Sequence, residues 1–181
     1  MRQRPGPRKP LPPLDAPTLD AIAMRYLERF QTSRARLIRL LKTKVRLRGW
    51  QQDAPPPDYD AIADRFVDLG YVNDLAFAES RSRSLARRGL GASRIRQTLR
   101  HSGIEEAHQQ TALGAQDEVA SAIAFARKKR LGPYGPPPAT PEARRRAYAA
   151  MARAGHPPKL IRAILSAATE ADLPESGEDG V

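Results

Sequence analysis

Residues Ser93–Ile104, SRIRQTLRHSGI, contain the pattern from which the fold can be predicted. Ile95 and Leu99 are four residues apart, so they lie on one face of a helix, and Gly103 is placed to end that helix. The apolar residue Ile104 then leads into the next helical segment. The pattern is therefore a short helix, a glycine stop, an apolar residue and a second helix.

The same pattern occurs at two other places in the chain. The segment 141–155 is followed by a helical segment from His156 to Leu165, and the segment 33–49 is followed by Trp50 and a longer insertion. Each short helix comes after a longer helix that ends in a break. We therefore expect three helix groups of about 50 residues each, and groups of that size stack or share faces because none can bury a large core alone.

The spacing of apolar residues, the helix caps and the glycine stops predict nine helices. No segment shows the period of two that is typical of a strand, so the expected fold class is all-α. The predicted helices span residues 18–30, 33–49, 58–69, 75–88, 93–103, 105–113, 116–130, 140–154 and 158–168. The three groups are residues 18–70 (the first helix group), 71–114 (the second) and 115–170 (the third).

The two ends of the chain differ in composition from the helical part. Residues 1–17 contain six prolines and several basic residues, so we expect a disordered basic arm, and residues 171–181 are predicted to form a disordered acidic tail. Prolines, and not an apolar segment, follow the basic N-terminal residues, which argues against a secretory signal. No apolar run approaches the length that spans a bilayer. We expect a cytoplasmic protein without a membrane segment.

The formal net charge is +11, with 31 lysines and arginines against 20 aspartates and glutamates. Such an excess repels itself in a compact state unless an anionic partner is near, and nucleic acid, an anionic membrane surface and an acidic protein groove are the candidates. A genome that favours arginine codons would also raise the charge. The clustering of the basic residues favours a binding role.

Two segments, 33–49 and 80–103, each contain seven basic residues and no acidic residue. Arg83 and Arg87 share one helical face, and Arg96 and Arg100 share another, so adjacent helices would join them into a patch suited to phosphate or carboxylate. The alternative is a solvated basic face. The residues predicted to bind nucleic acid or a filament are Arg81, Arg83, Arg87, Arg88, Arg94, Arg96, Arg100, Arg34, Arg39 and Lys42.

The residues that catalysis commonly requires are missing or scattered. The chain has no cysteine and three histidines that lack a second ligand at metal spacing, and its glycines do not form a phosphate-binding loop. We interpret His156, which precedes Pro157, as a turn residue. Asp60 and Asp64 lie on one helical face, and we interpret them as surface residues or salt-bridge partners. We expect no enzymatic activity, no cofactor and no metal.

Several motifs resemble the central block of the RecX family of bacterial proteins that regulate the RecA recombinase. The motifs are LGYVND at 69–74, Phe77-Ala78, RGLG at 88–91, IRQTL at 95–99 and Gly103-Ile104. The resemblance implies three tandem three-helix repeats in an elongated, curved array, which agrees with the three groups above. Pro55–Pro57 depart from the family pattern by lengthening a link in the first group.

The resemblance also implies a function. Members of the family lie in the groove of the filament that RecA forms on single-stranded DNA, block its growth or promote its disassembly, and lower ATP hydrolysis and strand exchange in recombination, repair and the SOS response. The implied partners are the RecA filament and single-stranded or double-stranded DNA, and the implied state is a monomer. The sequence leaves inhibition, the expected sense, and stimulation both open.

Two other functions fit part of the pattern. Ser93–Ile104 also resembles one helix and turn of a helix-turn-helix, so a DNA-binding transcriptional regulator is the alternative. The recurrence of the unit, and the absence of an evident dimerisation or ligand domain, favour the filament regulator. An RNA-binding helical repeat is a third hypothesis.

Overall fold

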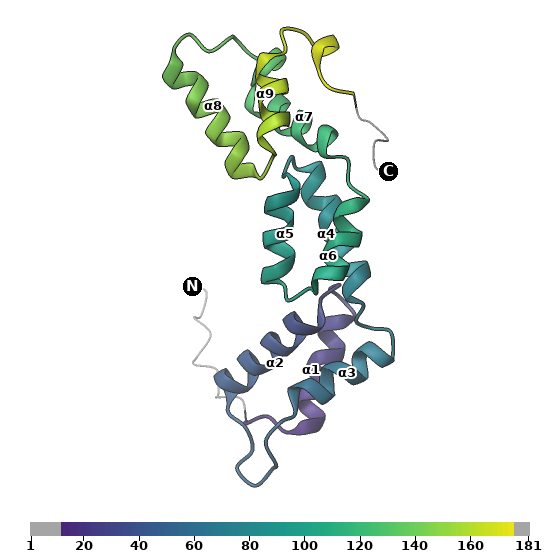
Figure 1. Ribbon diagram of the computed structural model, residues 1–181. Coiled ribbons are helices and arrows are strands. Elements are labelled where there is room, and N and C mark those ends of the chain that lie inside the picture. The colour runs from purple at the N-terminus through teal and green to yellow at the C-terminus, as the bar shows by residue number, and fades with distance from the viewer. Residues whose placement is uncertain (1–11, 176–181) are drawn as a thin grey trace, which may run out of the picture. The chain divides into compact units, whose positions relative to one another are not determined.

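The computed structural model describes residues 12–175, and all regular elements in that range are helices (Figure 1). An isolated bridge between Leu14 and Trp50 is the one β-type pairing in the described range. The chain divides into two compact units, the first ending at Asn73 and the second beginning at Asp74. Residues 1–11 of the predicted arm and 176–181 of the predicted tail lie outside the described residues.

The first unit contains α1 (Ala16–Leu27), α2 (Arg34–Arg48) and α3 (Tyr59–Asp68). Its core consists of side chains that are at most 9% exposed, drawn from all three helices and from the segments on either side of them. These core residues are Leu14, Leu19, Ala23, Leu37, Ile38, Leu41, Ala63, Phe66 and Val72. The first helix group therefore has its own apolar core.

The second unit contains six α-helices within the described range. They are α4 (Asp74–Arg87), α5 (Ala92–His101), α6 (Glu106–Gly114), α7 (Glu118–Lys129), α8 (Pro141–Ala154) and α9 (Pro158–Ser166). Two single 3-10 turns, η1 (Gly132–Tyr134) and η2 (Glu170–Asp172), follow α7 and α9. One core lies among α4, α5 and α6, and another among α7, α8 and α9.

The all-α fold of tandem three-helix groups is thus confirmed. α4 packs against α5 and α6, α9 packs against α7 and α8, and each of the three groups encloses a separate core. The second and third groups additionally contact each other through α4 with α7 and through α5 with α8. These added contacts explain why two groups form one compact unit.

The helix ends follow the chemistry of the residues that bound them. The side chain of Ser33 accepts a hydrogen bond from the Arg36 amide and begins α2, and the side chain of Thr140 accepts one from the Ala143 amide and begins α8. Gly155 ends α8 with a φ of 94°, a left-handed conformation that favours glycine. These three boundaries were predicted from the sequence.

The ends of the helical region differ from the prediction. The helix expected from residue 18 begins at Ala16, because Asp15 caps it through the Thr18 amide and Pro17 fits its first turn. Leu14 is fully buried, so residues 12–17 belong to the first unit and do not continue the arm. At the other end, η2 follows α9 and Leu173 packs against the third core, so residues 171–175 are structured as well.

Phe30 and Leu69, the last residues of the predicted helices 18–30 and 58–69, lie beyond the ends of α1 and α3 and are exposed. Phe30 is 55% exposed because α1 ends at Leu27, before the apolar stripe does. Leu69 is 60% exposed because it caps α3, and Val72 enters the first core in its place.

None of the helices in residues 12–175 combines the length and the apolar character needed to cross a bilayer.

Candidate nucleic-acid interface

Two glycines bring the second and third helix groups into backbone contact. The Gly91 amide donates to the Ala154 carbonyl at 2.9 Å, and the Ser93 amide donates to the Gly155 carbonyl at 3.3 Å. A Cβ added to Gly91 would collide with the backbone of Gly155, and one added to Gly155 would collide with the backbone of Arg94. Only glycine therefore allows the start of α5 to lie against the end of α8.

A buried histidine completes this junction. His156 is 5% exposed, its Nε2 lies 3.0 Å from the Gly89 carbonyl, and its ring lies 5.6 Å from the ring of Phe125. Burial lowers the pKa of His156, and the hydrogen bond to Gly89 offsets part of that effect. The neutral ring with a proton on Nε2 fits this site, because the Gly89 oxygen can only accept. His156 lies in the predicted turn but also joins the two groups.

The junction places four arginines around one groove, which we call the arginine groove. It has a volume of about 410 Å³. Its lining residues come from the α5 end of the second group and the α8 end of the third: Ser93, Arg94, Arg96, Gln97, Arg100, Ala152, Arg153 and Gly155. Arg94, Arg96 and Arg100 are among the predicted binding residues, and Arg153 is an addition.

The electrostatics of the arginine groove suit an anion. None of the described residues that line it is acidic. The guanidinium of Arg94 donates to the Gln97 side chain, which is neutral, while Arg96, Arg100 and Arg153 are exposed and form no ion pair within residues 12–175. The N-terminal end of α5 adds the partial positive charge of a helix start. Guanidinium groups in such an arrangement can bind phosphate oxygens in pairs.

The predicted arginines on α4, and Arg88 directly after it, are placed differently. The guanidinium of Arg83 lies 3.9 Å from the carboxylate of Glu79 on the same helix. Glu79 is the residue directly before the acid-free segment 80–103. Arg87 and Arg88 are exposed, whereas Arg81 is half-buried and its Nε is a buried atom without a hydrogen-bond partner. None of these four lines the arginine groove.

The predicted residues on α2 belong to the first unit. Arg34 donates through Nε to Asp64 at 2.6 Å and through Nη2 to Asp60 at 2.9 Å, which ties α2 to α3. These hydrogen bonds hold the pKa of the Asp64 carboxyl below its usual range and raise the pKa of Arg34. Arg39 is exposed, and the Lys42 ammonium lies 5.5 Å from the centre of the Tyr59 ring.

This ion pair confirms the interpretation of Asp60 and Asp64 as salt-bridge partners. It also shows that Arg34, one of the ten predicted binding residues, forms an ion pair between two helices of the first unit.

No group of three or more histidines, aspartates or glutamates within residues 12–175 is arranged to hold a metal ion.

The sequence did not reveal Arg153. It lies two residues before Gly155, far in sequence from the acid-free segment of residues 80–103. The signal that could have found it is the pair of glycines, Gly91 and Gly155, because their close approach is what places α8 beside α5.

Comparison with known proteins agrees with this architecture. Residues 73–113, which include α4, α5 and most of α6, match the family model described as RecX, second three-helix domain. The regulatory protein RecX of Myxococcus xanthus (strain DK1622) is 34% identical over 160 residues, which are 83% of this chain and 84% of that protein. The regulatory protein RecX of Thermobifida fusca (strain YX) is 32% identical over 174 residues, which are 88% of this chain and 85% of that protein.

Solved structures show the same fold. The crystal structure of RecX from Lactobacillus salivarius superposes with a TM-score of 0.60 at 18% identity and covers 82% of this chain and 92% of that one. A second crystal structure of a regulatory protein RecX gives a TM-score of 0.62 at 18% identity, covering 82% of this chain and 70% of that one.

Proposed function

Since the chain belongs to the RecX family of regulatory proteins, we propose that it regulates the RecA recombinase by binding the filament that RecA forms on single-stranded DNA. The expected sense is inhibition of ATP hydrolysis, strand exchange and filament growth. The chain itself acts by binding and carries out no chemical reaction in this proposal.

The arginine groove is the observation that carries the proposal. Four cations from two helix groups surround a groove that no acidic side chain lines among the described residues, so the groove is complementary to a line of phosphates. A filament built on single-stranded DNA offers such phosphates, together with protein surface. The further arginines of α4 would extend the basic surface, as the sequence predicted.

The test is ATP hydrolysis by RecA on single-stranded DNA, measured while the purified protein is added at substoichiometric amounts. We expect the rate to fall, because a regulator that blocks growth or promotes disassembly removes active subunits from the filament. An unchanged rate over a wide range of ratios would show that the proposal is wrong.

The arginine groove is tested in the same assay. A variant with Arg94, Arg96, Arg100 and Arg153 replaced by alanine should lose most of the inhibition. The matched control replaces Lys128, Lys129, Arg145 and Arg146 by alanine, which removes the same charge from exposed positions outside the groove. Equal loss of inhibition in both variants would show that net charge, and not the groove, determines the effect.

One observation favours a second function, a helix-turn-helix transcriptional regulator. α4 and α5 are joined by a short turn, and Arg94 and Arg96 lie exposed in the first half of α5, where recognition helices contact bases. This function predicts strong preference for one double-stranded sequence over competitor DNA. The filament regulator predicts no such preference, so a competition assay distinguishes them.

A further inference from the structure

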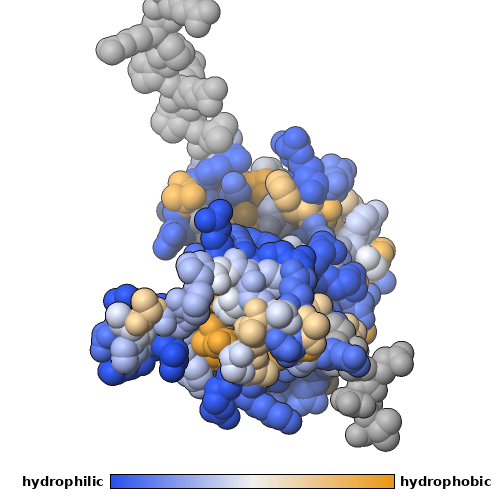
Figure 2. All heavy atoms as spheres, turned by 90° about the horizontal axis from the view of Figure 1, so that it is seen from above, coloured by the Kyte–Doolittle hydropathy of each residue, from blue (hydrophilic) through white to orange (hydrophobic). Residues whose placement is uncertain are grey.

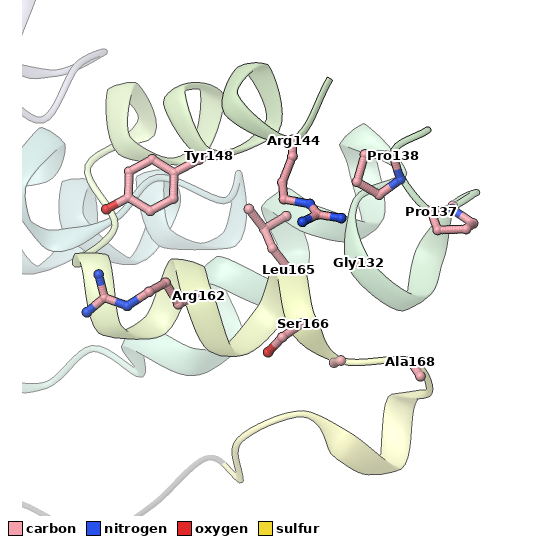
Figure 3. A pocket seen from close by; sticks show the side chains of 11 residues that line it. Gly132, Pro137, Pro138, Arg144, Tyr148, Arg162, Leu165, Ser166 and Ala168 are labelled. Carbon is pink, nitrogen blue, oxygen red and sulfur yellow. The ribbon is translucent and has the colours of Figure 1, made fainter. Parts of the chain in front are cut away.

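A second cavity lies wholly within the third helix group, apart from the arginine groove. It has a volume of about 750 Å³ and is lined by α8, α9, the segment after α9 and the loop between α7 and α8 (Figure 3). We call it the α8–α9 cleft. Tyr148 and Arg144 reach from α8 toward α9, and Leu165 reaches from α9 toward α8. Its volume is in the range of pockets that bind a ligand.

The wall that the loop contributes is held close to α9 by glycine. A Cβ on Gly132 would collide with the Ile164 carbonyl, and one on Gly135 would collide with the Arg130 carbonyl. Pro137 and Pro138 follow and line the cleft, and proline brings no backbone N–H. The loop thus forms a fixed apolar wall that offers few hydrogen-bond donors.

The remaining lining combines apolar surface with two cations. Leu165, Ala167 and Ala168 extend the apolar surface, while Arg144 and Arg162 are exposed guanidinium groups from facing helices. Neither arginine forms an ion pair within residues 12–175, whereas the neighbouring Arg145 lies 3.6 Å from Glu142. None of the described lining residues is acidic. The cleft is therefore complementary to a ligand in which an apolar group is flanked by negatively charged groups.

This combination disfavours nucleic acid as the occupant. Single-stranded nucleic acid binds to repeated aromatic platforms beside a continuous basic track, and Tyr148 is the one aromatic side chain among the lining residues.

Hydrophilic residues cover most of the visible face in Figure 2, and the apolar areas between them are small. An apolar anchor that enters a concave site, with charged contacts at the rim, is the arrangement in which one side chain supplies most of the binding energy.

We propose that the α8–α9 cleft binds an acidic protein segment, with one bulky apolar side chain against Leu165 and the proline wall and with carboxylates on Arg144 and Arg162. The site is distinct from the arginine groove, and the proposal does not rest on binding to the RecA filament. It adds a protein-docking site to the third helix group.

The experiment uses the full chain and a short fluorescein-labelled peptide with one phenylalanine between two runs of aspartate, measured by fluorescence anisotropy. We expect saturable binding that weakens at least about tenfold when the phenylalanine is replaced by serine, because the apolar anchor is lost. Equal binding of the two peptides would overturn the proposal, since it would show attraction to net charge alone.

Variants of the protein locate the binding. Arg144→Glu with Arg162→Glu should weaken binding at least about tenfold, because each carboxylate loses a charge-assisted hydrogen bond. The control Arg145→Glu with Arg146→Glu makes the same change of charge on α8 outside the cleft lining. Ala168→Trp should also block binding by filling the cleft at an exposed position, with Ala107→Trp on α6 as its control. Equal effects of a variant and its control would overturn the proposal.

Two further measurements would identify a different occupant of the α8–α9 cleft. If a labelled oligothymidine loses affinity for Arg144→Glu with Arg162→Glu while the peptide does not, the cleft binds nucleic acid and the proposal is wrong. If Glu178→Gln with Asp179→Asn in the full chain tightens peptide binding about tenfold, the chain's own acidic segment competes for the cleft, and the proposal that an external partner is its usual occupant is wrong. We expect neither result. Circular dichroism of each variant checks that it is folded.

Discussion

The two units use the same type of residue in different ways. In the first unit, Arg34 binds Asp60 and Asp64 and so ties α2 to α3, and Arg65 lies 2.6 Å from Asp20 and so ties α3 to α1. In the second unit, four arginines surround a groove whose described lining contains no acid. An acid-free run of sequence therefore does not by itself identify a binding surface. The deciding factor is whether a neighbouring helix places an acidic side chain beside the basic residues.

Substitution of one glycine in each unit should give the largest difference between the two units. Gly70 in the first unit and Gly155 in the second both have positive φ, 77° and 94°. A Cβ at Gly70 meets nothing within 4 Å, whereas one at Gly155 meets the Arg94 backbone. Gly155→Ala should therefore lower the free energy of unfolding by about 3 kcal/mol and Gly70→Ala by about 1 kcal/mol, as measured by urea denaturation. Gly155→Ala should also disrupt the arginine groove.

The control for both is Gly114→Ala. Gly114 is the last residue of α6, has no positive φ, and a Cβ there meets nothing within 4 Å. This substitution should leave stability unchanged or raise it slightly, since alanine has the higher helix propensity. If Gly155→Ala costs no more than Gly70→Ala, the close contact between α5 and α8 is not required for the fold.

The second test compares the cations of the two units directly. Alanine at Arg94, Arg96, Arg100 and Arg153 should lower the affinity for single-stranded DNA about fiftyfold at low salt. It should also reduce the slope of log affinity against log salt by about 3, at roughly 0.7 for each lost phosphate contact. The measurement is a salt titration of binding to oligothymidine. A matched variant has alanine at Arg36, Arg39, Lys44 and Arg46, which are exposed on α2.

We expect the α2 variant to lose less than about fivefold in affinity, because these exposed positions are not gathered around a groove. Losses of the same size in both variants would remove the distinction between the units and would show that α2, which carries Arg39, contributes to binding as much as the arginine groove does.

The smallest effect comes from releasing Arg34. Asp60→Asn with Asp64→Asn should raise the affinity for single-stranded DNA about threefold, because two negative charges are lost and one guanidinium is released. A fall in affinity would show that the released guanidinium of Arg34 does not contribute to DNA binding.

The same variant tests the contribution of this ion pair to stability, because the pKa of Asp64 is lowered in the folded state. The pair stabilises the fold above the ordinary carboxyl pKa of about 3.9, and this stability is lost as the pH falls through the lowered pKa of Asp64. The double variant should therefore unfold with a weaker pH dependence in acid.

The helical architecture was predictable because local chemistry determines it. Ser33, Asp58 and Thr140 cap helices through their own side chains, and Gly49 and Gly155 end them, so these boundaries can be read without tertiary contacts. Phe30 and Leu69 were misplaced because a helical pattern continued past the residue at which the helix ends. Leu14 was missed because its burial depends on pairing with Gly49 and Gln51, which are distant in sequence.

The candidate site was predictable only in part for the same reason. The arginines of α5 stand out because they lie in an acid-free segment, and three of them line the arginine groove. Arg153 and the environment of His156 depend on contact between residues more than 60 positions apart, such as His156 with Gly89. Likewise, the pairing of Arg34 depends on the packing of α3, and no local spacing indicates it.

The backbone hydrogen bonds at the glycine junction give the second unit a property that the helices alone would lack. The amide protons of Gly91 and Ser93 are donated to the third helix group, so they are protected only while the two groups are docked. Their rate of hydrogen–deuterium exchange therefore reports the opening of the junction separately from the unfolding of α5 or α8. A partner that binds across the arginine groove would slow that exchange, so these two amides are natural reporters of whether a ligand engages both helix groups at once.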